Sequence, residues 1–253
     1  MAESNPAGKL TVIGIGPGSL DDLTPRAETA LSQAEVIVGY NTYIKLIEPL
    51  INGKEIIGTG MMQEEARCRM AIESACLGKN TAVISSGDAG VYGMAGLVLE
   101  LLAEQEENLR PQFDCIPGVS AVNAAAAILG APLMHDFAVI SLSDRLTPWE
   151  TISRRLEAAA QGDFVIALYN PKSKTRQEHI TLAKEIMLRH KSPQTPVGIV
   201  TSVTRSGETK QIATLENFTE REINMFSLVI IGNSQTYVKN GYMITPRGYR
   251  VVK

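Results

Sequence analysis

Cysteine is scarce in this sequence, which has only Cys68, Cys76 and Cys115 among its 253 residues. No two of them form a CxxC pair, and three thiols are too few for a tetrathiolate cluster. The count argues against a structural zinc site, a cysteine-ligated iron–sulfur cluster and a disulfide scaffold. The three histidines lack metal-ligand spacing, so we expect each to be structural or exposed and predict no bound metal.

Long hydrophobic runs and a strong net charge are also absent. No uncharged apolar run reaches the roughly 18 residues that a membrane helix needs. The first ten residues, MAESNPAGKL, lack the apolar core of a signal peptide. A net charge of −3 argues against general nucleic-acid binding. We therefore expect a soluble cytoplasmic protein that binds neither membrane nor nucleic acid.

The small net charge hides an asymmetry between the two halves of the chain. Residues 1–130 hold 8 Lys and Arg against 16 Asp and Glu, whereas residues 131–253 hold 16 against 11. Either the basic second half holds an anionic ligand, or the solvated faces of the two halves differ by chance.

Apolar runs alternate with helical patterns in the first half, which predicts crossover units and a mainly parallel sheet. Thr24 and Pro25 form a helix start signal, because threonine caps free N–H groups and proline suits the first helical position. The expected strands are Leu10–Ile15, Glu35–Val38, Thr81–Ser85 and Phe113–Ile116. The expected helices are Pro25–Gln33, Gln63–Leu77, Tyr92–Glu104 and Val119–Leu129.

The stretch Gly130-Ala131-Pro132 interrupts this pattern and predicts a domain boundary. We expect two α/β domains, residues 1–130 and 131–253, the second with a mixed sheet. Thr147-Pro148-Trp149-Glu150 has the pattern of a capping box, and Val203–Leu215 that of a strand–turn–strand. The further expected elements are the strands Phe137–Leu142, Phe164–Leu168, Val197–Ser202 and Leu228–Ile231, and the helix Ser173–Arg189.

Three turns rich in small residues follow apolar strands of the first half: Gly14–Gly18, Ser85–Gly93 and Pro117–Ala121. Glycine lets the backbone approach a ligand closely, and ligands of open α/β sheets bind at the carboxyl ends of strands. Together the turns predict one extended ligand lying across them. Asp88 either binds this ligand or caps the following helix.

Several familiar motifs are missing or incomplete. The first turn lacks the third glycine of the dinucleotide fingerprint, since Ser19 stands there, and an acid suited to a ribose is absent. There is no GxSxG elbow, HExxH motif or GxxxxGK[ST] loop. We read Met61-Met62 as core residues instead of metal ligands.

The sequence resembles the tetrapyrrole methylase family over nearly its whole length, from about Leu10 to Tyr249. The resemblance rests on GIGPG with Leu23-Thr24-Pro25, on SSGDAGVYGMAG and on IPGVSA. The stretches LGAPLMHDF, ISLSD, LYNPKS, IGNS and TPRGY make it similar to the branch that methylates precorrin-3B or cobalt-factor III at C17 with ring contraction. Arg145 and Thr201–Arg205 depart from that branch's pattern.

The resemblance implies an enzyme of cobalamin biosynthesis, a homodimer that uses S-adenosylmethionine and has two domains enclosing the cofactor. Methyl transfer requires alignment and shielding from water more than covalent help. The implied cofactor-binding residues are Pro17, Gly87, Asp88, Val91, Tyr92, Ser120 and Ala121 on one wall, and Tyr169, Asn170, Thr201 and Gly232 on the other.

Ring contraction also requires proton transfers, for which an acid or base is needed. Ser141, Ser143 and Asp144 follow a second-domain strand and are the candidates, although Ser143 and Asp144 could simply shape their loop. The substrate implied by the resemblance is a polyanion, so Lys172 and Arg176 are candidates for binding its carboxylates. Two alternatives remain: another tetrapyrrole C-methyltransferase, or a non-catalytic module that binds an adenine nucleotide.

Overall fold

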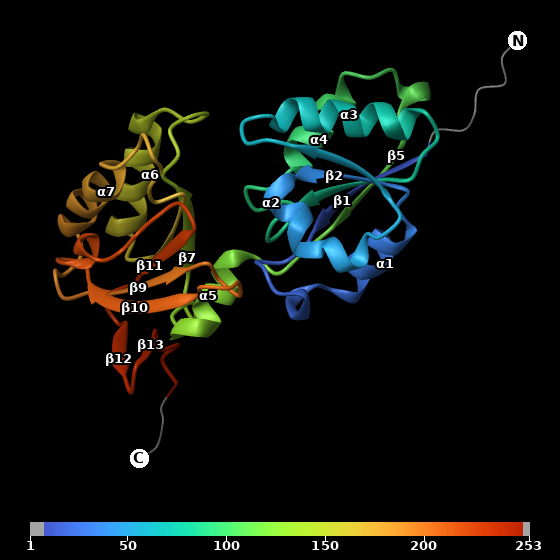
Figure 1. Ribbon diagram of the computed structural model, residues 1–253. Helices are drawn as coiled ribbons and strands as arrows, with labels where there is room; N and C mark the ends of the chain where they lie inside the picture. Colours follow the sequence, from blue (N-terminus) through green and yellow to red (C-terminus); the bar gives the residue numbers. More distant parts are fainter. Residues whose placement is uncertain (1–7, 250–253) are drawn as a thin grey trace, which may run out of the picture. The chain divides into compact units, whose positions relative to one another are not determined.

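The computed structural model describes residues 8–249, and expectations that concern residues 1–7 and 250–253 lie outside this range. The chain folds as two compact units, Met1–Ala121 and Val122–Lys253. Each unit is built from a sheet and helices (Figure 1), so the predicted α/β class is confirmed.

The sheet of the first unit has five parallel strands in the order β3-β2-β4-β1-β5. All five carboxyl ends therefore meet at one edge. The four predicted strands are present within one or two residues, whereas β3 was not predicted because it is a largely exposed edge strand without an apolar run. The strands are β1 (Lys9–Gly14), β2 (Val36–Tyr40), β3 (Glu55–Thr59), β4 (Thr81–Ser85) and β5 (Gln112–Ile116).

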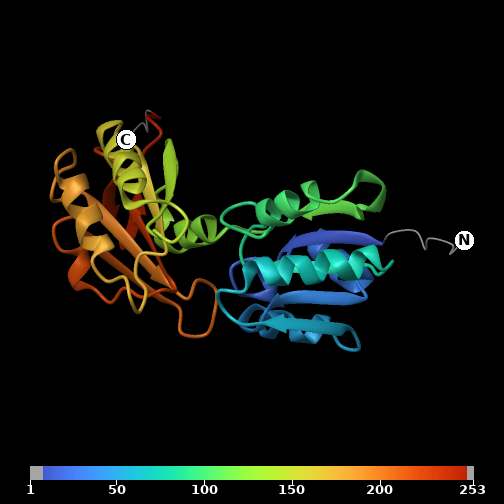
Figure 2. The ribbon, with the colours of Figure 1, turned by 90° about the horizontal axis from the view of Figure 1, so that it is seen from above.

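Helices cover both faces of this sheet, since alternate strand residues face opposite layers. Val36 and Val38 join the core beneath α3 and α4, and Ile37 joins the core beneath α1. Figure 2 looks onto the face that α3 and α4 cover. The helices are α1 (Pro25–Gln33), α2 (Asn41–Ile44), α3 (Glu64–Cys76) and α4 (Ala95–Ala103), with 3-10 turns η1 (Leu20–Asp22), η2 (Lys45–Leu50) and η3 (Glu107–Leu109).

The second unit has the predicted mixed sheet, in the order β10-β9-β11-β8-β7, together with a small sheet β12-β13-β6. Strands β7 and β8 are parallel, whereas β11 is antiparallel to both β8 and β9. The elements are α5 (Ala121–Leu129), β6 (Gly130–Ala131), β7 (Phe137–Ser141), α6 (Trp149–Gln161), β8 (Val165–Tyr169), α7 (His179–Leu188), β9 (Pro196–Thr201), β10 (Thr209–Thr214), η4 (Phe218–Glu220), β11 (Ser227–Ile231), β12 (Tyr237–Lys239) and β13 (Tyr242–Ile244).

Helix α5 belongs with the second unit, so the division falls nine residues before the stretch Gly130–Pro132 that marks it in the sequence. The tertiary packing explains the difference. Leu129 of α5 lies so close to Gly198 of β9 that a Cβ at position 198 would clash with it. The chain then runs directly into β6, which pairs with β13.

Three local predictions in the second unit are wrong. Thr147 does not cap α6, because Pro148 is the N-cap residue and no side chain caps the helix. The segment after β8 forms a turn in which Ser173 and Arg176 exchange hydrogen bonds, so α7 begins only at His179. Only one strand, β10, lies in Val203–Leu215, and it forms its hairpin with β9.

None of the helices in the described part of the chain combines the length and apolar character of a membrane-spanning helix.

Candidate functional site

The three small-residue turns of the first unit meet at the carboxyl ends of β4, β1 and β5. The backbones of Gly16 and Gly87 exchange two hydrogen bonds of 3.1 and 2.7 Å. The Asp88 carboxylate accepts a hydrogen bond of 3.0 Å from the N–H of Gly118. The structure thus brings together the turns that the sequence predicts to share one ligand.

Glycine is required here because the turns approach each other backbone to backbone. A Cβ on Gly14 would lie 2.6 Å from the nitrogen of Gly118 and 2.8 Å from the carbonyl oxygen of Gly87. A Cβ on Gly118 would lie 2.3 Å from the carbonyl oxygen of Gly87 and 2.6 Å from that of Gly14. Gly16 and Gly87 also have φ angles of +76° and +69°, a region that favours glycine.

Asp88 fastens this arrangement and does not cap helix α4, whose N-cap residue is Met94. One carboxylate oxygen accepts hydrogen bonds from the N–H groups of Gly90 and Val91, at 2.8 and 3.1 Å. The other oxygen accepts the bond from Gly118. The carboxylate therefore connects the turn after β4 with the turn after β5.

The remaining predicted cofactor residues of this unit lie in or beside the same turns. Tyr92 has a φ of +52° and a 56% exposed side chain, and Val91 is 39% exposed. Helix α4 begins at Ala95, so both residues lie in the loop and not in the helix. Pro17, Ser120 and Ala121 occupy the other two turns.

A second group of predicted residues lies at the carboxyl ends of β7, β8 and β9. The Tyr169 hydroxyl accepts the N–H of Val122 at 3.0 Å, which ties the end of β8 to the start of α5. Asn170 has a φ of +51°, and its side-chain amide donates to the Ser141 hydroxyl at 3.0 Å. Thr201 shares a 2.7 Å hydrogen bond with Ser227.

Asp144 lies between two cationic or ionisable groups at this edge. Its carboxylate oxygens are 3.7 Å from Nη1 of Arg176 and 3.6 Å from Nε2 of His179. Nδ1 of His179 is 3.0 Å from the carbonyl oxygen of Leu142. Because a carbonyl only accepts, Nδ1 donates this hydrogen bond, and Nε2 faces the Asp144 carboxylate.

His179 was missed as a site residue in the sequence, where it has no metal-ligand or triad spacing. Its ring stacks on Trp149 with centroids 4.4 Å apart, and only the fold brings α6 and α7 into this contact. No local signal in the sequence identifies the pairing.

Arg176 is held in a largely buried position beside these candidates. Its Nη2 donates to the carbonyl oxygen of Asn170 at 2.9 Å, and its Nη1 is 3.4 Å from the Ser143 hydroxyl. Burial lowers the pKa of Arg176, the Asp144 carboxylate opposes this shift, and nearby Arg145 adds to it. Among the residues that the structure describes, its buried Nε has no hydrogen-bond partner. An anionic ligand would therefore stabilise this guanidinium.

Lys172 lies in the same loop and is half-buried, with no hydrogen-bond or ion-pair partner within residues 8–249. Its ammonium group is thus available to an anion at the β8 end of the sheet.

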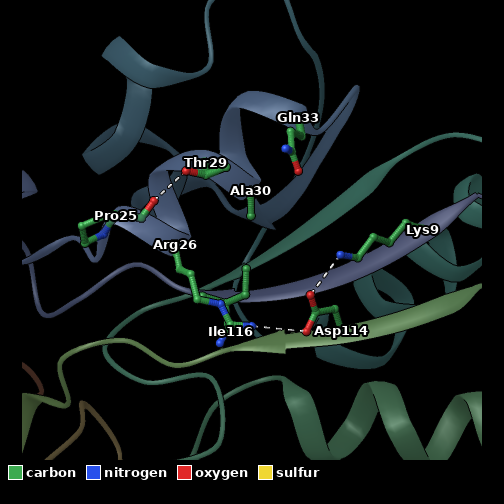
Figure 3. Close-up of a pocket in the computed structure, with 8 residues that line it drawn as sticks. All are labelled: Lys9, Pro25, Arg26, Thr29, Ala30, Gln33, Asp114 and Ile116. Atoms are coloured by element: carbon green, nitrogen blue, oxygen red, sulfur yellow. Dashed lines mark hydrogen bonds and ion pairs between the residues drawn. The ribbon is translucent and has the colours of Figure 1, made fainter.

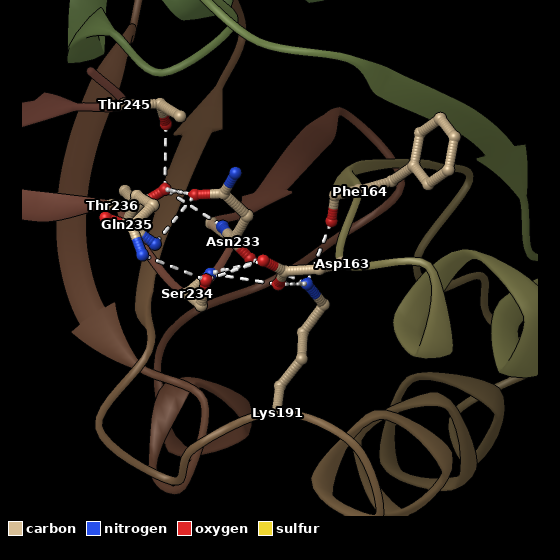
Figure 4. A network of polar contacts seen from close by, with 9 residues as sticks. Asp163, Phe164, Lys191, Asn233, Ser234, Gln235, Thr236 and Thr245 are labelled. Atoms are coloured by element: carbon tan, nitrogen blue, oxygen red, sulfur yellow. Dashed lines mark hydrogen bonds and ion pairs between the residues drawn. The ribbon is translucent and has the colours of Figure 1, made fainter. Parts of the chain in front are cut away.

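The structure places Gly232 away from Tyr169, Asn170 and Thr201, at the opposite edge of the sheet. It follows β11, which is antiparallel to β8 and β9, so its carboxyl end points the other way. There its carbonyl accepts from the buried Lys191 at 3.2 Å. Figure 4 shows the surrounding polar network of Asp163, Lys191 and Ser234. Gly232 therefore does not belong with the other predicted residues of this unit.

A cavity of about 350 Å³ lies elsewhere in the first unit, between α1 and strands β1 and β5 (Figure 3). Asp114 lines the cavity and forms ion pairs with two other lining residues, Lys9 at 2.9 Å and Arg26 at 3.7 Å. None of the predicted site residues lines this cavity.

The fold agrees with the comparison to known families. Residues 9–219 match the model of the tetrapyrrole (corrin/porphyrin) methylases, and the chain belongs to that family. A "Cobalt-factor III methyltransferase" of Priestia megaterium is 51% identical over 96% of this chain, which spans 45% of that protein. A "Probable cobalt-factor III C(17)-methyltransferase" of Salmonella typhimurium is 52% identical over 95% of this chain and 99% of its own length.

Solved structures share this fold. The methyltransferase CobJ is 38% identical, with a TM-score of 0.90 over 95% of this chain and 100% of its own. The cobalt precorrin-4 methyltransferase CbiF is 24% identical, with a TM-score of 0.73 over 88% of this chain and 94% of its own, and shares the fold.

Proposed function

We propose that the protein methylates cobalt-factor III at C17 with ring contraction, a step of cobalamin biosynthesis. The observation that carries the proposal is the 52% identity to the Salmonella typhimurium relative over 99% of that protein's length. The name of the Priestia megaterium relative also refers to cobalt-factor III, which favours the cobalt-bound substrate over metal-free precorrin-3B.

The proposed methyl donor is S-adenosylmethionine, whose sulfonium supplies an electrophilic methyl group when bound. The three joined turns suit such a ligand, because their glycines leave backbone groups accessible at the carboxyl edge of a parallel sheet. In the first unit the proposed binding residues are Pro17, Gly87, Asp88, Val91, Tyr92, Ser120 and Ala121. In the second unit they are Tyr169, Asn170 and Thr201.

Asp144 is the proposed acid–base group for ring contraction, with Ser141 and Ser143 beside it. The Ser141 hydroxyl accepts hydrogen bonds from Asn170 and from the N–H of Ser143, at 3.0 and 3.2 Å. The Asp144 side chain is 44% exposed, so it is accessible to a substrate while Arg176 and His179 orient it. Lys172 and Arg176 are the proposed partners of substrate carboxylates.

Two other functions make different predictions. Another tetrapyrrole C-methyltransferase of the family would methylate a different carbon, and a non-catalytic adenine-nucleotide module would bind ligand without turnover. Calorimetry with S-adenosylhomocysteine and with NAD separates the nucleotide module from both enzymes.

The deciding experiment is anaerobic incubation with labelled S-adenosylmethionine and either cobalt-factor III or precorrin-3B, followed by mass analysis of the pigment. We expect one added methyl group at C17 and a contracted ring with cobalt-factor III. Methylation at another carbon, or none with either substrate, would contradict the proposal. The cytoplasmic location and the homodimer remain predictions, which fractionation and light scattering of the purified chain can test.

A further inference from the structure

Arg67 is a buried cation whose partners within residues 8–249 are all neutral. It lies on α3 and is 4% exposed. Its Nε donates to the Thr59 hydroxyl at 2.7 Å, its Nη2 to the carbonyl of Gly60 at 3.1 Å, and its Nη1 to the sulfur of Met94 at 3.8 Å. Its Cζ lies 6.0 Å from the centre of the Tyr40 ring.

Such a charge is costly unless an anion compensates it. Arg67 is also in the first turns of α3, where the helix dipole disfavours a cation. The acidic residues of this first turn, Glu64 and Glu65, are exposed, and Glu65 pairs with Arg69. The fold therefore keeps a buried positive charge without supplying its counter-charge.

The guanidinium has room for a further acceptor in its hydrogen-bonding pattern. It offers five N–H donors, of which oxygen atoms of the described residues take one on Nε and one on Nη2. The Nη1 contact is to a weakly accepting thioether. A carboxylate is the ligand that matches the remaining fork of parallel N–H groups.

The position of Arg67 is at the ligand-binding edge of the first sheet. Two of its partners, Tyr40 and Thr59, are the last residues of β2 and β3. Gly60 follows β3 and Met94 precedes α4, beside the glycine turns that follow β4, β1 and β5. Gly60 leads directly into Met61 and Met62, which are 52% and 64% exposed and so are not core residues. Exposed apolar side chains beside a buried cation suit a flat ring with carboxylate substituents.

We infer that Arg67 binds a carboxylate of the tetrapyrrole substrate, an identity that rests on the proposed function. The carboxylate of the methyl donor has the same chemistry. The tetrapyrrole is favoured because Arg67 lies on the β2–β3 side of the edge, whereas the glycine turns lie on the β4–β1–β5 side. Exposed Met61 and Met62 follow β3 through Gly60 and so belong to the former side.

The test compares the full chain with its Arg67→Met and Arg67→Lys variants, and with Arg69→Met as a control. Arg69 is on the same helix, and its side chain is 44% exposed. Its replacement by methionine changes the net charge by the same amount as Arg67→Met without removing a buried cation. Calorimetry measures the Kd of uroporphyrin III, a non-reactive tetrapyrrole polycarboxylate, and of S-adenosylhomocysteine. Thermal denaturation without ligand measures stability, and mellitate, a flat aromatic polycarboxylate, serves as a second probe.

We expect Arg67→Met to weaken uroporphyrin binding roughly 10–150-fold, with an unchanged Kd for S-adenosylhomocysteine and an unligated Tm no lower than that of wild type. The Kd of Arg67→Lys for uroporphyrin should lie between those of wild type and Arg67→Met, and the Kd of Arg69→Met should equal that of wild type. A weakened Kd for S-adenosylhomocysteine alone would overturn the assignment to the substrate. A lowered Tm with unchanged Kd values would mean that Arg67 only stabilises the loop between β3 and α3, and would overturn the inference.

Failure of the proposed function is recognised separately. If wild type does not bind uroporphyrin but is stabilised by mellitate through Arg67, the carboxylate site stands and the tetrapyrrole assignment fails. If wild type and both Arg67 variants bind uroporphyrin with equal Kd and are stabilised equally by mellitate, the inference itself is overturned. Should Arg67→Met not fold, the same comparisons are made with Arg67→Lys, which retains the charge and loses the fork.

Discussion

Asp88 accepts three backbone hydrogen bonds from two different turns, so one side chain joins the turns at the carboxyl ends of β4 and β5. This role differs from the two that its sequence position predicts, ligand contact and helix cap. We expect Asp88 to affect cofactor binding by holding the two turns in position, as well as by any direct contact with the ligand.

Substitution of Asp88 tests this role. Asp88→Ala removes both acceptor oxygens and with them all three hydrogen bonds. Each hydrogen bond to a charged group is worth about 1.5–3 kcal/mol. We expect a folded variant that binds S-adenosylhomocysteine roughly 10–150-fold more weakly by calorimetry. Asp88→Asn keeps one acceptor oxygen and should lose less. Wild-type affinity in folded Asp88→Ala would remove this residue from the site.

Asp144 allows the two proposed chemistries to be separated. Asp144→Asn abolishes the carboxylate between Arg176 and His179 but touches no proposed cofactor residue. We expect S-adenosylhomocysteine affinity to persist, while ring contraction slows by about 10²–10⁴-fold and more than methylation does, as measured by the ratio of pigment products. Asp136→Asn is the control, since its side chain is 75% exposed. A wild-type yield of contracted product would leave Asp144 a loop-shaping residue.

At the scale of elements, the turns of the first unit depend on the close approach of backbone segments. Gly118→Ala would place a methyl group against the carbonyl oxygens of Gly14 and Gly87. We expect a loss of about 1–3 kcal/mol in the free energy of unfolding, measured by urea denaturation, together with weaker cofactor binding.

The matched control is Gly96→Ala in helix α4. No atom lies within 4 Å of a Cβ built there, and alanine favours a helix over glycine by up to about 1 kcal/mol. This variant should be as stable as wild type or more stable. Equal losses in the two variants would show that the contacts between the turns are not what makes position 118 sensitive.

The loop after β8 is the element that we expect to bind the anionic substrate. Lys172→Ala should raise the apparent KM, and more at low salt than at high salt because the contact is screened. Lys174→Ala, an exposed lysine of the same loop, should have little effect. If tetrapyrrole binding by the Lys172 variant matches wild type throughout a salt titration, the carboxylates are held elsewhere.

At the scale of the whole molecule, a polar network ties together distant segments of the second unit (Figure 4). Burial alone would raise the pKa of Asp163, but hydrogen bonds from Ser234 and the charge of Lys191 together lower it. The pKa of Lys191 is lowered by burial, against the pull of Asp163. Both groups therefore make the stability of the chain depend on pH.

The two shifts act in different pH ranges. Because the pKa of Asp163 is lower in the folded state, its stabilising contribution is present above the ordinary aspartate pKa of about 3.9 and is lost as pH falls through the folded value. The lowered pKa of Lys191 destabilises the fold at neutral pH and is relieved as pH rises toward the ordinary lysine pKa of about 10.4.

Asp163→Asn should have a lower Tm than wild type at pH 7, and the difference should shrink as pH falls below about 4. Ser234→Ala removes the hydroxyl that donates to Asp163 and keeps the backbone N–H that also donates to it. This variant should therefore show a smaller loss in Tm with the same dependence on pH. A difference in Tm that stays constant from pH 7 to pH 3 would mean that the Asp163 carboxylate does not contribute through its ionisation.

Local sequence patterns determined much of this fold. The apolar runs identified the central strands, and the Thr24–Pro25 signal located α1, whose N–H at Ala27 is capped as expected. The three glycine turns were predicted to share one edge of the sheet, and they meet there because parallel strands bring their carboxyl ends together. Such features depend on residues that are neighbours in sequence.

Tertiary structure decided what depends on strand direction and long-range contact. Antiparallel β11 puts Gly232 at the far edge of its sheet, and contact with Gly198 draws α5 into the second unit. His179 meets Asp144 only after distant elements pack. The same packing buries Arg67 without a counter-charge from residues 8–249. These contacts cannot be predicted from the charge, size and spacing of residues along the chain, because each depends on where the folded backbone places a side chain in space.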